Sequence, residues 1–461
     1  MRLVAVILPY AVSIRDFVHT GVLSELLGIP GVHIHIYTQN AALPEFDAIR
    51  FERITLMEIQ PHRERRFERL LKKLYPILFY DVFVHVQQNV DKVWHRRLVV
   101  KALVLCRRLL GTRRALRLYA WLLGRVSTRA DEHLITGRPD LVISTRSLVN
   151  ALDYPLILEA AERGLLQLTA ASSWDNFTTK GFFPFPVART IVWNRQMAKE
   201  LIEIFEVAPE KIVLAGYPRL KLLRNSGTID GPESYLRQLG LGQYRRFILH
   251  TASYAELTRT RPDQAPEEYR LIREVGAALL ATLPPDTCIL VRLHPYSRQE
   301  DEQIFAGLDR LHVHVPGRQD SYVERVMSEA DEIHLSAQLK YSECVISMAS
   351  TITIDALSLG RPIINLRFDP EGSSSGVIRR FYEFNHFRDL LAQVKPPVAA
   401  DVGEVMAFVR RCMAGDRDPQ ADLTAFERCY VPADSSAYPQ VIRRTVEELL
   451  DALPAELAAA R

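Results

Sequence analysis

Residues 344–362 place small hydroxyl side chains between a short apolar stretch and a helical pattern. We expect a strand over 344–347, followed by a helix that begins at Ser350 and Thr351, where free N–H groups and the helix dipole attract phosphate. Asp355 lies one turn later on the same face as Thr351, where a carboxylate could accept hydrogen bonds from a ribose diol. The segment predicts a nucleotide site, although Ser350 could also be a plain helix cap and Asp355 a solvated helix residue.

A second candidate segment is the apolar stretch that ends in Arg292-Leu293-His294-Pro295. Because side chains alternate along a strand, Arg292 and His294 are expected on the same side of it. At the end of a strand, His294 could donate a hydrogen bond to a phosphate or to a leaving-group oxygen, and Arg292 could bind the same donor. The alternative is that the imidazole of His294 bonds only to a neighbouring loop.

A third candidate segment, residues 173–181, comes shortly after the apolar stretch 166–170 and is rich in polar groups. Asp175 is a candidate general base, and Lys180 could tune its charge or bind an anion. Trp174 and Asn176 are expected beside them, lining an acceptor site. The alternative is a tight turn in which Asp175 bonds to its own backbone.

Strand-like and helix-like stretches alternate along most of the chain, which predicts parallel sheets with helices on both faces. The expected strands cover residues 3–8, 32–37, 141–144, 166–170, 191–193, 211–214, 247–251, 288–293, 312–315, 344–347 and 362–366. The polar, turn-rich stretch 226–243 is the expected domain boundary. We therefore predict an α/β fold of two Rossmann-like, doubly wound domains, 1–228 and 244–400, facing each other across a cleft, with a helical segment at 401–461. Ligands bind beyond the carboxyl ends of the strands in such sheets.

Length and composition restrict the class of protein. The 461 residues suit two domains, and 48% hydrophobic with 25% charged residues is ordinary globular usage. No uncharged run reaches the ~18 residues that a spanning helix requires. The N-terminus resembles a buried first strand more than an export signal, and the five cysteines are scattered without metal-ligand spacing. We expect a cytoplasmic protein with reduced thiols and neither a metal nor a cofactor.

Charge is distributed unevenly: residues 1–150 carry a net charge of +10, whereas the rest of the chain carries −7. Much of the basic excess lies in 62–73 and in 92–125, and the second stretch holds ten Lys and Arg residues and no acid. Basic residues interleaved with Leu and Trp are typical of a helix on an anionic bilayer, so we expect contact with the inner face of the plasma membrane. The alternatives are a solvated helical face and a nucleic-acid patch. We expect no nucleic-acid partner, because no recognised reading module accompanies these stretches.

Taken together, these segments resemble bacterial nucleotide-sugar glycosyltransferases with two Rossmann-like domains (the GT-B architecture). The relatives are capsule, surface-polysaccharide and glycerophosphate transferases and the UDP-N-acetylglucosamine 2-epimerases. The resemblance covers most of 1–390 and is carried by the 292–295 and 350–362 segments and by Gly216-Tyr217-Pro218-Arg219, with Arg15-Asp16 matching a first-domain segment that faces the cleft.

The resemblance implies roles for particular positions. Ser350 and Thr351 would bind the donor diphosphate, Asp355 the ribose, and His294 the donor phosphates. Arg219 would belong to the donor site and Arg15 to the acceptor site. Asp175, or Asp16 in its place, would accept the proton of the acceptor hydroxyl.

The expected activity is transfer of a sugar or polyol phosphate from a nucleotide sugar or CDP-alcohol to a polysaccharide or lipid-linked acceptor. The epimerases carry Ser-Gly-Gly where this chain has Ala349-Ser350-Thr351, which favours transfer. An epimerase-like isomerase and a non-catalytic subunit of polysaccharide assembly remain as alternatives.

Overall fold

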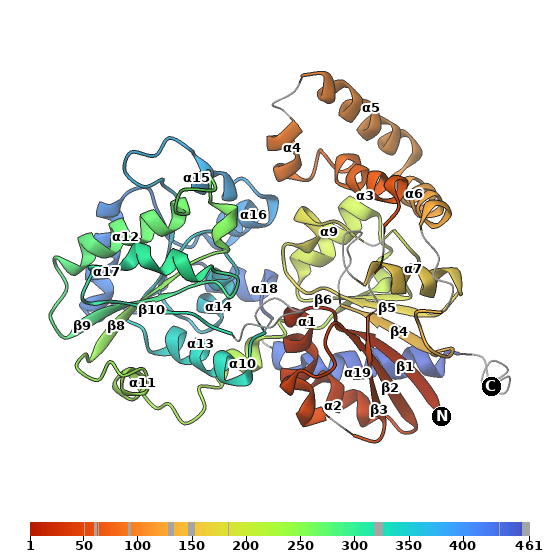
Figure 1. Cartoon of the computed structure of the whole chain (residues 1–461), viewed down its shortest axis with the longest axis horizontal. Coiled ribbons are helices and arrows are strands. Elements are labelled where there is room, and N and C mark those ends of the chain that lie inside the picture. Colours follow the sequence, from red (N-terminus) through yellow and green to blue (C-terminus); the bar gives the residue numbers. More distant parts are fainter. Residues whose placement is uncertain are drawn as a thin grey trace. The chain divides into compact units, whose positions relative to one another are not determined.

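The computed structural model describes residues 1–49, 51–59, 62, 64–90, 94–127, 133–145, 153–182, 184–317, 326–432 and 434–453. The chain forms two compact units (Figure 1). The first comprises Met1–Pro218 together with Pro432–Arg461, and the second comprises Arg219–Val431.

A seven-stranded sheet, in which every pair of neighbouring strands is parallel, forms the centre of the first unit. Its strand order is β3-β2-β1-β4-β5-β6-β7. The strands are β1 (Arg2–Ile7), β2 (Val32–Thr38), β3 (Ile54–Glu58), β4 (Leu141–Ser144), β5 (Gln167–Ala170), β6 (Arg189–Val192) and β7 (Ile212–Leu214). The order reverses between β1 and β4, where Ile7 lies opposite Ser144. This reversal is the usual position of a ligand site in such a sheet.

Helices pack on this sheet and on one another. They are α1 (Ala11–Ile14), α2 (Val22–Leu27), α3 (Arg66–Leu78), α4 (Val84–Val90), α5 (Trp94–Leu110), α6 (Thr112–Val126), α7 (Tyr154–Glu162), α8 (Asn176–Thr179), α9 (Arg195–Phe205) and α19 (Tyr438–Asp451). The sequence pattern predicts one helix over 14–27. The structure instead has α1, a π-helical turn over Arg15–His19 and then α2, because Gly21 adopts a left-handed φ of 90° that ends the first helical run.

A six-stranded parallel sheet forms the centre of the second unit, in the order β10-β9-β8-β11-β12-β13. The strands are β8 (Arg246–Thr251), β9 (Thr287–Arg292), β10 (Leu311–His314), β11 (Val345–Ser347), β12 (Ile363–Leu366) and β13 (Val398–Ala399). The order reverses between β8 and β11, and there Thr251 lies opposite both Ser347 and Arg292. The predicted α/β class with two parallel sheets is confirmed.

The helices of the second unit enclose a core of buried side chains from β8, β9, β11 and β12. They are α10 (Leu220–Arg224), α11 (Pro232–Gln238), α12 (Glu267–Leu280), α13 (Glu329–Tyr341), α14 (Ile352–Ser358), α15 (Val377–Phe381), α16 (Asn385–Val394), α17 (Val402–Met413) and α18 (Leu423–Cys429).

The two units divide the chain differently from the boundaries expected at 228, 244 and 400. Residues 219–243 belong to the second unit because α10 packs on α13 and α14, and α11 packs on α13 and β8. The predicted C-terminal helical segment is divided between the units: α17 and α18 stay in the second, whereas α19 packs against α2 in the first.

Four helices of the first unit, α3 to α6, pack on one another as a separate layer. In Figure 1, α3 and α6 lie between α5 and the rest of the unit, and α3 packs against both α5 and α6. Within the described residues, no helix is both long and apolar enough to cross a bilayer.

Candidate functional site

Hydroxyl side chains meet where the strand order of the second sheet reverses. Thr251 Oγ1, at the end of β8, donates to Ser347 Oγ at 2.9 Å, and Ser347 Oγ lies 3.0 Å from Ser350 Oγ. Ser350 Oγ also accepts a hydrogen bond from Ile352 N at 3.3 Å. The structure thus places a helix start at Ser350 and Thr351, as expected, and adds Thr251, which sequence reasoning missed. Because α14 has only seven residues, hydroxyl and N–H groups matter more here than a helix dipole.

His294 stands just beyond the end of β9 and is held by its own loop. Its Nδ1 accepts a hydrogen bond from Tyr296 N at 3.2 Å, so the neutral imidazole carries its hydrogen on Nε2. Burial, with a smaller effect of the Arg292 charge, lowers the pKa of His294 to about 4. The rings of Tyr254 and Tyr296 flank it, at centroid distances of 5.6 and 4.9 Å. The imidazole of His294 is therefore bonded to its own loop, as the alternative interpretation of this segment expects. This bond uses only Nδ1, so Nε2–H can still act as a neutral hydrogen-bond donor.

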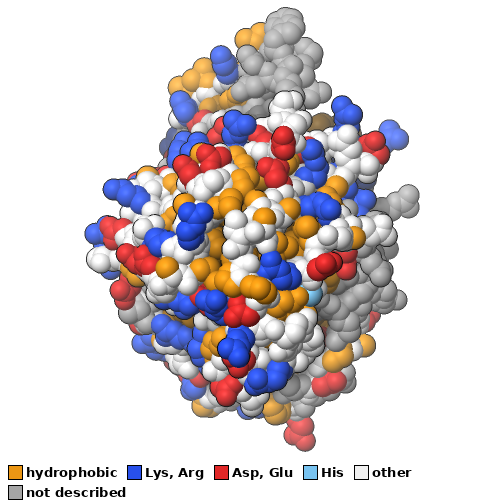
Figure 2. Space-filling view, turned by 90° about the vertical axis from the view of Figure 1, so that its left-hand side faces the viewer, with side chains coloured by type: hydrophobic (Ala, Val, Ile, Leu, Met, Phe, Trp, Pro, Cys, Tyr) orange, Lys and Arg blue, Asp and Glu red, His pale blue; other side chains and the backbone are white. Residues whose placement is uncertain are grey.

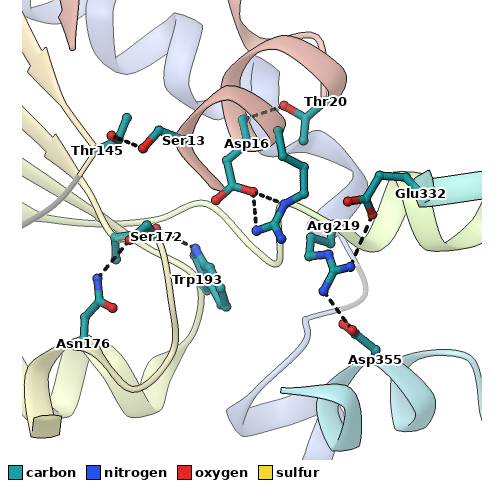
Figure 3. Close-up of polar contacts among 12 residues, drawn as sticks. Ser13, Asp16, Thr20, Thr145, Ser172, Asn176, Trp193, Arg219, Glu332 and Asp355 are labelled. Atoms are coloured by element: carbon teal, nitrogen blue, oxygen red, sulfur yellow. Dashed lines mark hydrogen bonds and ion pairs between the residues drawn. The ribbon is translucent and has the colours of Figure 1, made fainter. Parts of the chain in front are cut away.

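Asp355 and Arg219 form an ion pair inside the second unit (Figure 3). Arg219 Nη1 donates to Asp355 Oδ2 at 2.8 Å, and Arg219 Nη2 donates to Glu332 Oε2 at 3.2 Å. Asp355 is completely buried and Arg219 is 8% exposed. The carboxylate expected to hold a ribose is therefore bonded to a guanidinium from the start of the unit, and the pair joins α14 to α13 and to the residue before α10.

Arg292 belongs to the same buried layer. Its Nη1 donates to Gln338 Oε1 at 3.0 Å and lies 3.3 Å from His314 Nδ1. Burial lowers the pKa of Arg292, and the charge of Glu332 opposes this effect. Arg292 thus points toward α13, and its charge interacts with the Glu332 carboxylate that also accepts a hydrogen bond from Arg219.

Removing one partner from this network is expected to destabilise the fold. Asp355→Asn leaves the buried Arg219 charge without its nearest carboxylate, which costs about 3–5 kcal/mol of unfolding free energy. Urea unfolding of the full chain measures it. The matched control is Asp286→Asn, which breaks the partly exposed pair with Arg246 at 3.6 Å and is expected to cost no more than about 1 kcal/mol. Equal losses of unfolding free energy in the two variants would contradict a buried, stabilising ion pair between Arg219 and Asp355.

In the first unit, Asp175 follows β5 and immediately precedes α8. Its Oδ2 accepts a hydrogen bond from Thr179 Oγ1 at 2.8 Å and lies 3.8 Å from Lys180 Nζ. The side chain is 22% exposed, so the carboxylate is partly open to solvent. Burial lowers the pKa of His85, on α4, and the negative charge of Asp175 partly offsets that effect, which identifies His85 as an electrostatic neighbour of Asp175. The sequence analysis predicts no role for the stretch that contains His85, so sequence reasoning missed it.

The neighbours of Asp175 are held firmly. Trp174 is 4% exposed, and Asn176 is completely buried. Asn176 Nδ2 donates to Ser172 Oγ at 3.4 Å (Figure 3), whereas Asn176 Oδ1 is buried without a hydrogen-bond partner among the described residues. Gly181 follows with a left-handed φ of 95°, and a Cβ there would collide with the ring of Tyr75.

Tyr75 connects this loop to the layer of helices. Its hydroxyl donates to Phe182 O and accepts from Phe182 N at 2.9 Å. The helix α3 therefore fixes the backbone that follows the Asp175 segment, which also explains why residue 181 is glycine.

Asp16 and Arg15 lie near the reversal between β1 and β4. Arg15 Nη2 contacts Asp16 Oδ1 at 2.7 Å, and Thr20 Oγ1 donates to Asp16 O at 2.6 Å. Asp16 is only 3% exposed. Beside them, Thr145 Oγ1 donates to Ser13 Oγ at 2.7 Å (Figure 3). Asp16 thus has a cationic partner and less solvent access than Asp175.

The predicted residues therefore fall into three groups. Ser350, Thr351 and His294 belong to segments that follow the carboxyl ends of β11 and β9. Arg219, Arg292 and Asp355 form the buried network behind them, and Asp175, Lys180, Asp16 and Arg15 lie in the first unit. Among the described residues, no cluster of three or more His, Cys, Asp or Glu side chains could hold a metal ion.

Three histidines of the second unit make its stability sensitive to acid. Burial lowers the pKa of His250 and of His314 to about 3 each and that of His294 to about 4, against 6.5 in an unfolded chain. Below pH 6.5 the unfolded chain gains protons that the folded chain does not, so the unfolding free energy falls as pH decreases. Each histidine contributes up to about 1.4 kcal/mol per pH unit. We expect His314→Gln to reduce the dependence of the unfolding free energy on pH, measured by urea unfolding at several pH values below 6.5. An unchanged slope would contradict the burial of the His314 imidazole.

Comparison with known proteins identifies the family. A family model described as CDP-Glycerol:Poly(glycerophosphate) glycerophosphotransferase matches residues 169–448, more than half of the chain. The chain belongs to this family. No curated protein matches the sequence. The match begins in β5 and ends in α19, so it includes the Asp175 segment, the whole second unit and part of the returning C-terminal helix.

Solved structures agree on the fold of this family member. The Staphylococcus aureus MnaA–UDP co-structure aligns with a TM-score of 0.55 at 10% identity and covers 98% of each chain. A putative UDP-N-acetylglucosamine 2-epimerase from Listeria monocytogenes gives a TM-score of 0.53 at 12% identity and 97% coverage of each chain. The wall teichoic acid polymerase TagF gives 0.50 at 12% identity, over 98% of this chain and 89% of that chain. At these identities the likeness establishes the GT-B fold.

Proposed function

We propose that the protein transfers a glycerophosphoryl group, or a related polyol phosphate or sugar, from a nucleotide-activated donor to a hydroxyl of a polysaccharide or lipid-linked acceptor. Membership of the glycerophosphotransferase family supports a transferase. The observation that carries the proposal is the hydroxyl chain Thr251–Ser347–Ser350, which lies at the carboxyl edge of the second sheet beside the segment that bears His294.

The second unit is proposed to bind the donor. Ser350 and Thr351 would hydrogen-bond the diphosphate, and the Nε2–H of His294 would donate to the oxygen that leaves with the nucleotide. A neutral donor positioned in advance stabilises the negative charge that develops there. Arg219, Arg292 and Asp355 are proposed to support this edge from within the second unit, since Arg219 and Asp355 are already paired with each other and Arg292 is held by Gln338.

The first unit is proposed to bind the acceptor and accept its proton. The acceptor oxygen attacks the transferred phosphorus (or the sugar carbon), the bond to the nucleotide breaks, and the hydroxyl proton passes to a carboxylate. Asp175 fits this role better than Asp16, because Asp16 is paired with Arg15 and almost completely buried. Lys180 and Thr179 would hold the Asp175 carboxylate in position. The unpartnered Asn176 Oδ1 supplies a further acceptor of hydrogen bonds, and Trp174 an apolar wall.

The decisive assay measures which nucleotide is released. Purified protein is incubated with CDP-glycerol or with UDP-sugars, with and without a lipid-linked or polysaccharide acceptor. We expect acceptor-dependent release of CMP, or of UDP if the donor is a sugar, and we expect it to persist in the presence of EDTA. Acceptor-independent conversion of UDP-N-acetylglucosamine to an epimer would contradict the proposal. A lipid-linked acceptor would place the reaction at the inner face of the plasma membrane.

A further inference from the structure

Two consecutive residues at the start of α12 hold the loops that follow β8 and β9. The first is Glu268, in the first turn of the helix. On the face shown in Figure 2, acidic side chains lie beside basic ones at the surface. Glu268 is instead 3% exposed, and its two oxygens accept the backbone N–H of Ser253 at 2.9 and 3.0 Å. A buried carboxylate that is bound in this way fixes the segment that donates to it.

Ser253 belongs to the loop that leads from β8 to the aromatic ring beside His294. It lies between Thr251, which begins the hydroxyl chain, and Tyr254, whose ring centre is 5.6 Å from that of His294. Glu268 therefore determines where the Tyr254 ring stands against the imidazole.

Tyr269, the second residue, holds the loop that carries His294. Its side chain is completely buried, and its hydroxyl lies 2.8 Å from Ser297 Oγ. Ser297 donates to His294 O from both its N, at 2.9 Å, and its Oγ, at 2.6 Å. Because the hydrogen of the Ser297 hydroxyl is used in this way, the Tyr269 hydroxyl donates to Ser297 Oγ. The first turn of α12 thus braces both loops around the His294 ring.

The surroundings of Glu268 make its charge responsive to pH near neutrality. Burial raises the pKa of Glu268 to about 7, although the hydrogen bonds from Ser253 oppose this effect. Tyr382 is a titratable neighbour on the β12 side: its hydroxyl donates to Leu366 O at 2.7 Å, and the charge of Glu268 adds to the burial that raises its pKa. Arg367 lies 5.7 Å from the centre of the Tyr382 ring.

Other charged side chains on the segments packed around the first turn of α12 have partners of their own. Glu256 contacts Arg259 and Arg298, Arg292 donates to Gln338, Arg379 contacts Asp369, Arg380 donates to Ser375 O, and Arg411 contacts Asp416. The hydrogen bond from Ser253 is therefore the contact that changes when Glu268 gains or loses its charge.

We propose that Glu268 and Tyr269 are positioning residues, which hold the loops after β8 and β9 so that the Nε2–H of His294 is aimed at the donor. The bracing is a property of the chain without ligand, whereas its effect on turnover rests on the proposed function. Neither residue exchanges a proton with the substrate. Ionised Glu268 accepts a charge-assisted hydrogen bond from Ser253 N, and the protonated form accepts a weaker, neutral one. Protonation of Glu268 therefore loosens the loop after β8.

The bracing by Glu268 is tested by hydrogen exchange of the full chain without ligand, followed by mass spectrometry on the peptide that covers residues 252–258. Protection is corrected for the pH dependence of intrinsic exchange and measured from about pH 6 to about pH 8. We expect protection to rise about fivefold as Glu268 ionises, because the hydrogen bond from Ser253 N strengthens. Glu268→Gln cannot ionise, so it should show no such rise.

The matched control is Glu404→Gln. Glu404 also lies in the first turn of a helix of the second unit and accepts a backbone N–H, from Ala400 at 2.7 Å. This variant should keep the rise in protection of residues 252–258. A rise that persists in Glu268→Gln, or that is lost in Glu404→Gln as well, would overturn the role of Glu268.

Tyr269→Phe removes one hydroxyl from the brace of the His294 loop and keeps the ring in the core. We expect faster exchange of residues 294–298 without ligand and a kcat about tenfold lower, because the imidazole is less well aimed. Tyr341→Phe is the control, since the Tyr341 hydroxyl donates to Ile229 O at 2.7 Å, elsewhere in the same unit. Loss of one hydrogen bond should lower the unfolding free energy of both variants alike, but only Tyr269→Phe should change kcat or the exchange of that loop.

Exchange and turnover together distinguish the bracing from the proposed function. Protection that depends on Glu268 and Tyr269 in a protein without transferase activity supports the bracing and counts against the function. Transfer by a protein whose exchange is the same in Glu268→Gln and Tyr269→Phe as in the unaltered chain overturns the bracing and keeps the function.

Discussion

Asp175→Asn is expected to lower kcat for transfer by about 10²–10⁴-fold while leaving the affinity for the nucleotide donor unchanged. The asparagine side chain has nearly the same shape and can still accept the hydrogen bond from Thr179, but it cannot take a proton. Because Asp175 lies in the first unit and the proposed donor residues lie in the second, the substitution should separate turnover from donor binding. Single-turnover rates and equilibrium binding of CDP-glycerol measure the two effects.

Two controls make the Asp175 result specific. Thr179→Val removes the hydroxyl that contacts the carboxylate but keeps the base, and it should cost less than tenfold. Asp16→Asn should also leave kcat nearly intact, because Asp16 is paired with Arg15. If Asp16→Asn abolished turnover and Asp175→Asn did not, the roles of the two carboxylates would have to be exchanged.

His294→Asn is expected to lower kcat by about 10²–10³-fold, the usual loss when one hydrogen-bond donor to a developing negative charge is removed. Asparagine reproduces the position of Nδ1 and can still accept the hydrogen bond from Tyr296 N, so the loop should be preserved. It does not extend to the position of Nε2. The loss therefore reports on donation to the leaving oxygen and not on loop structure.

His294→Gln provides the complementary test, because the glutamine amide reaches the position of Nε2 and can donate from it. Partial recovery relative to His294→Asn is expected. Burial lowers the pKa of His294 to about 4, so the imidazole is neutral near pH 7. The pH profile of kcat should therefore show no step near pH 6.5 that is present in the unaltered chain and absent in His294→Gln. Such a titration would mean that the protonated imidazole is the active form.

The sequence predicted the parts of the molecule that depend on local pattern. Apolar stretches that end in polar groups define the carboxyl edge of each sheet, and for that reason Ser350, His294 and Asp175 were found at strand ends. Ion pairs between distant segments could not be predicted from the sequence. Arg219 and Asp355 are separated by 136 positions, and nothing in either segment indicates that the other is its partner. Asp355, which was expected to bind a ribose or else to be a solvated helix residue, is instead completely buried.

Other features required tertiary packing. The helical pattern of the C-terminal segment predicts helices but not that α19 packs on α2 of the first unit. Thr251 ends an ordinary apolar strand, and only its register opposite Ser347 reveals the hydroxyl chain. His85 lies far from Asp175 in sequence, and nothing in its own segment indicates the electrostatic interaction between the two residues.

The central claim is that the hydroxyl edge of the second sheet binds the diphosphate of the donor, and calorimetric titration of CDP and CDP-glycerol into the full chain tests it most directly. Ser350→Asp places a negative charge where the phosphates are proposed to lie, and Ser24→Asp adds the same charge at an exposed position of the first unit. We predict that the unaltered chain and Ser24→Asp bind both ligands and that Ser350→Asp binds neither. Binding of equal strength by all three proteins would contradict the account.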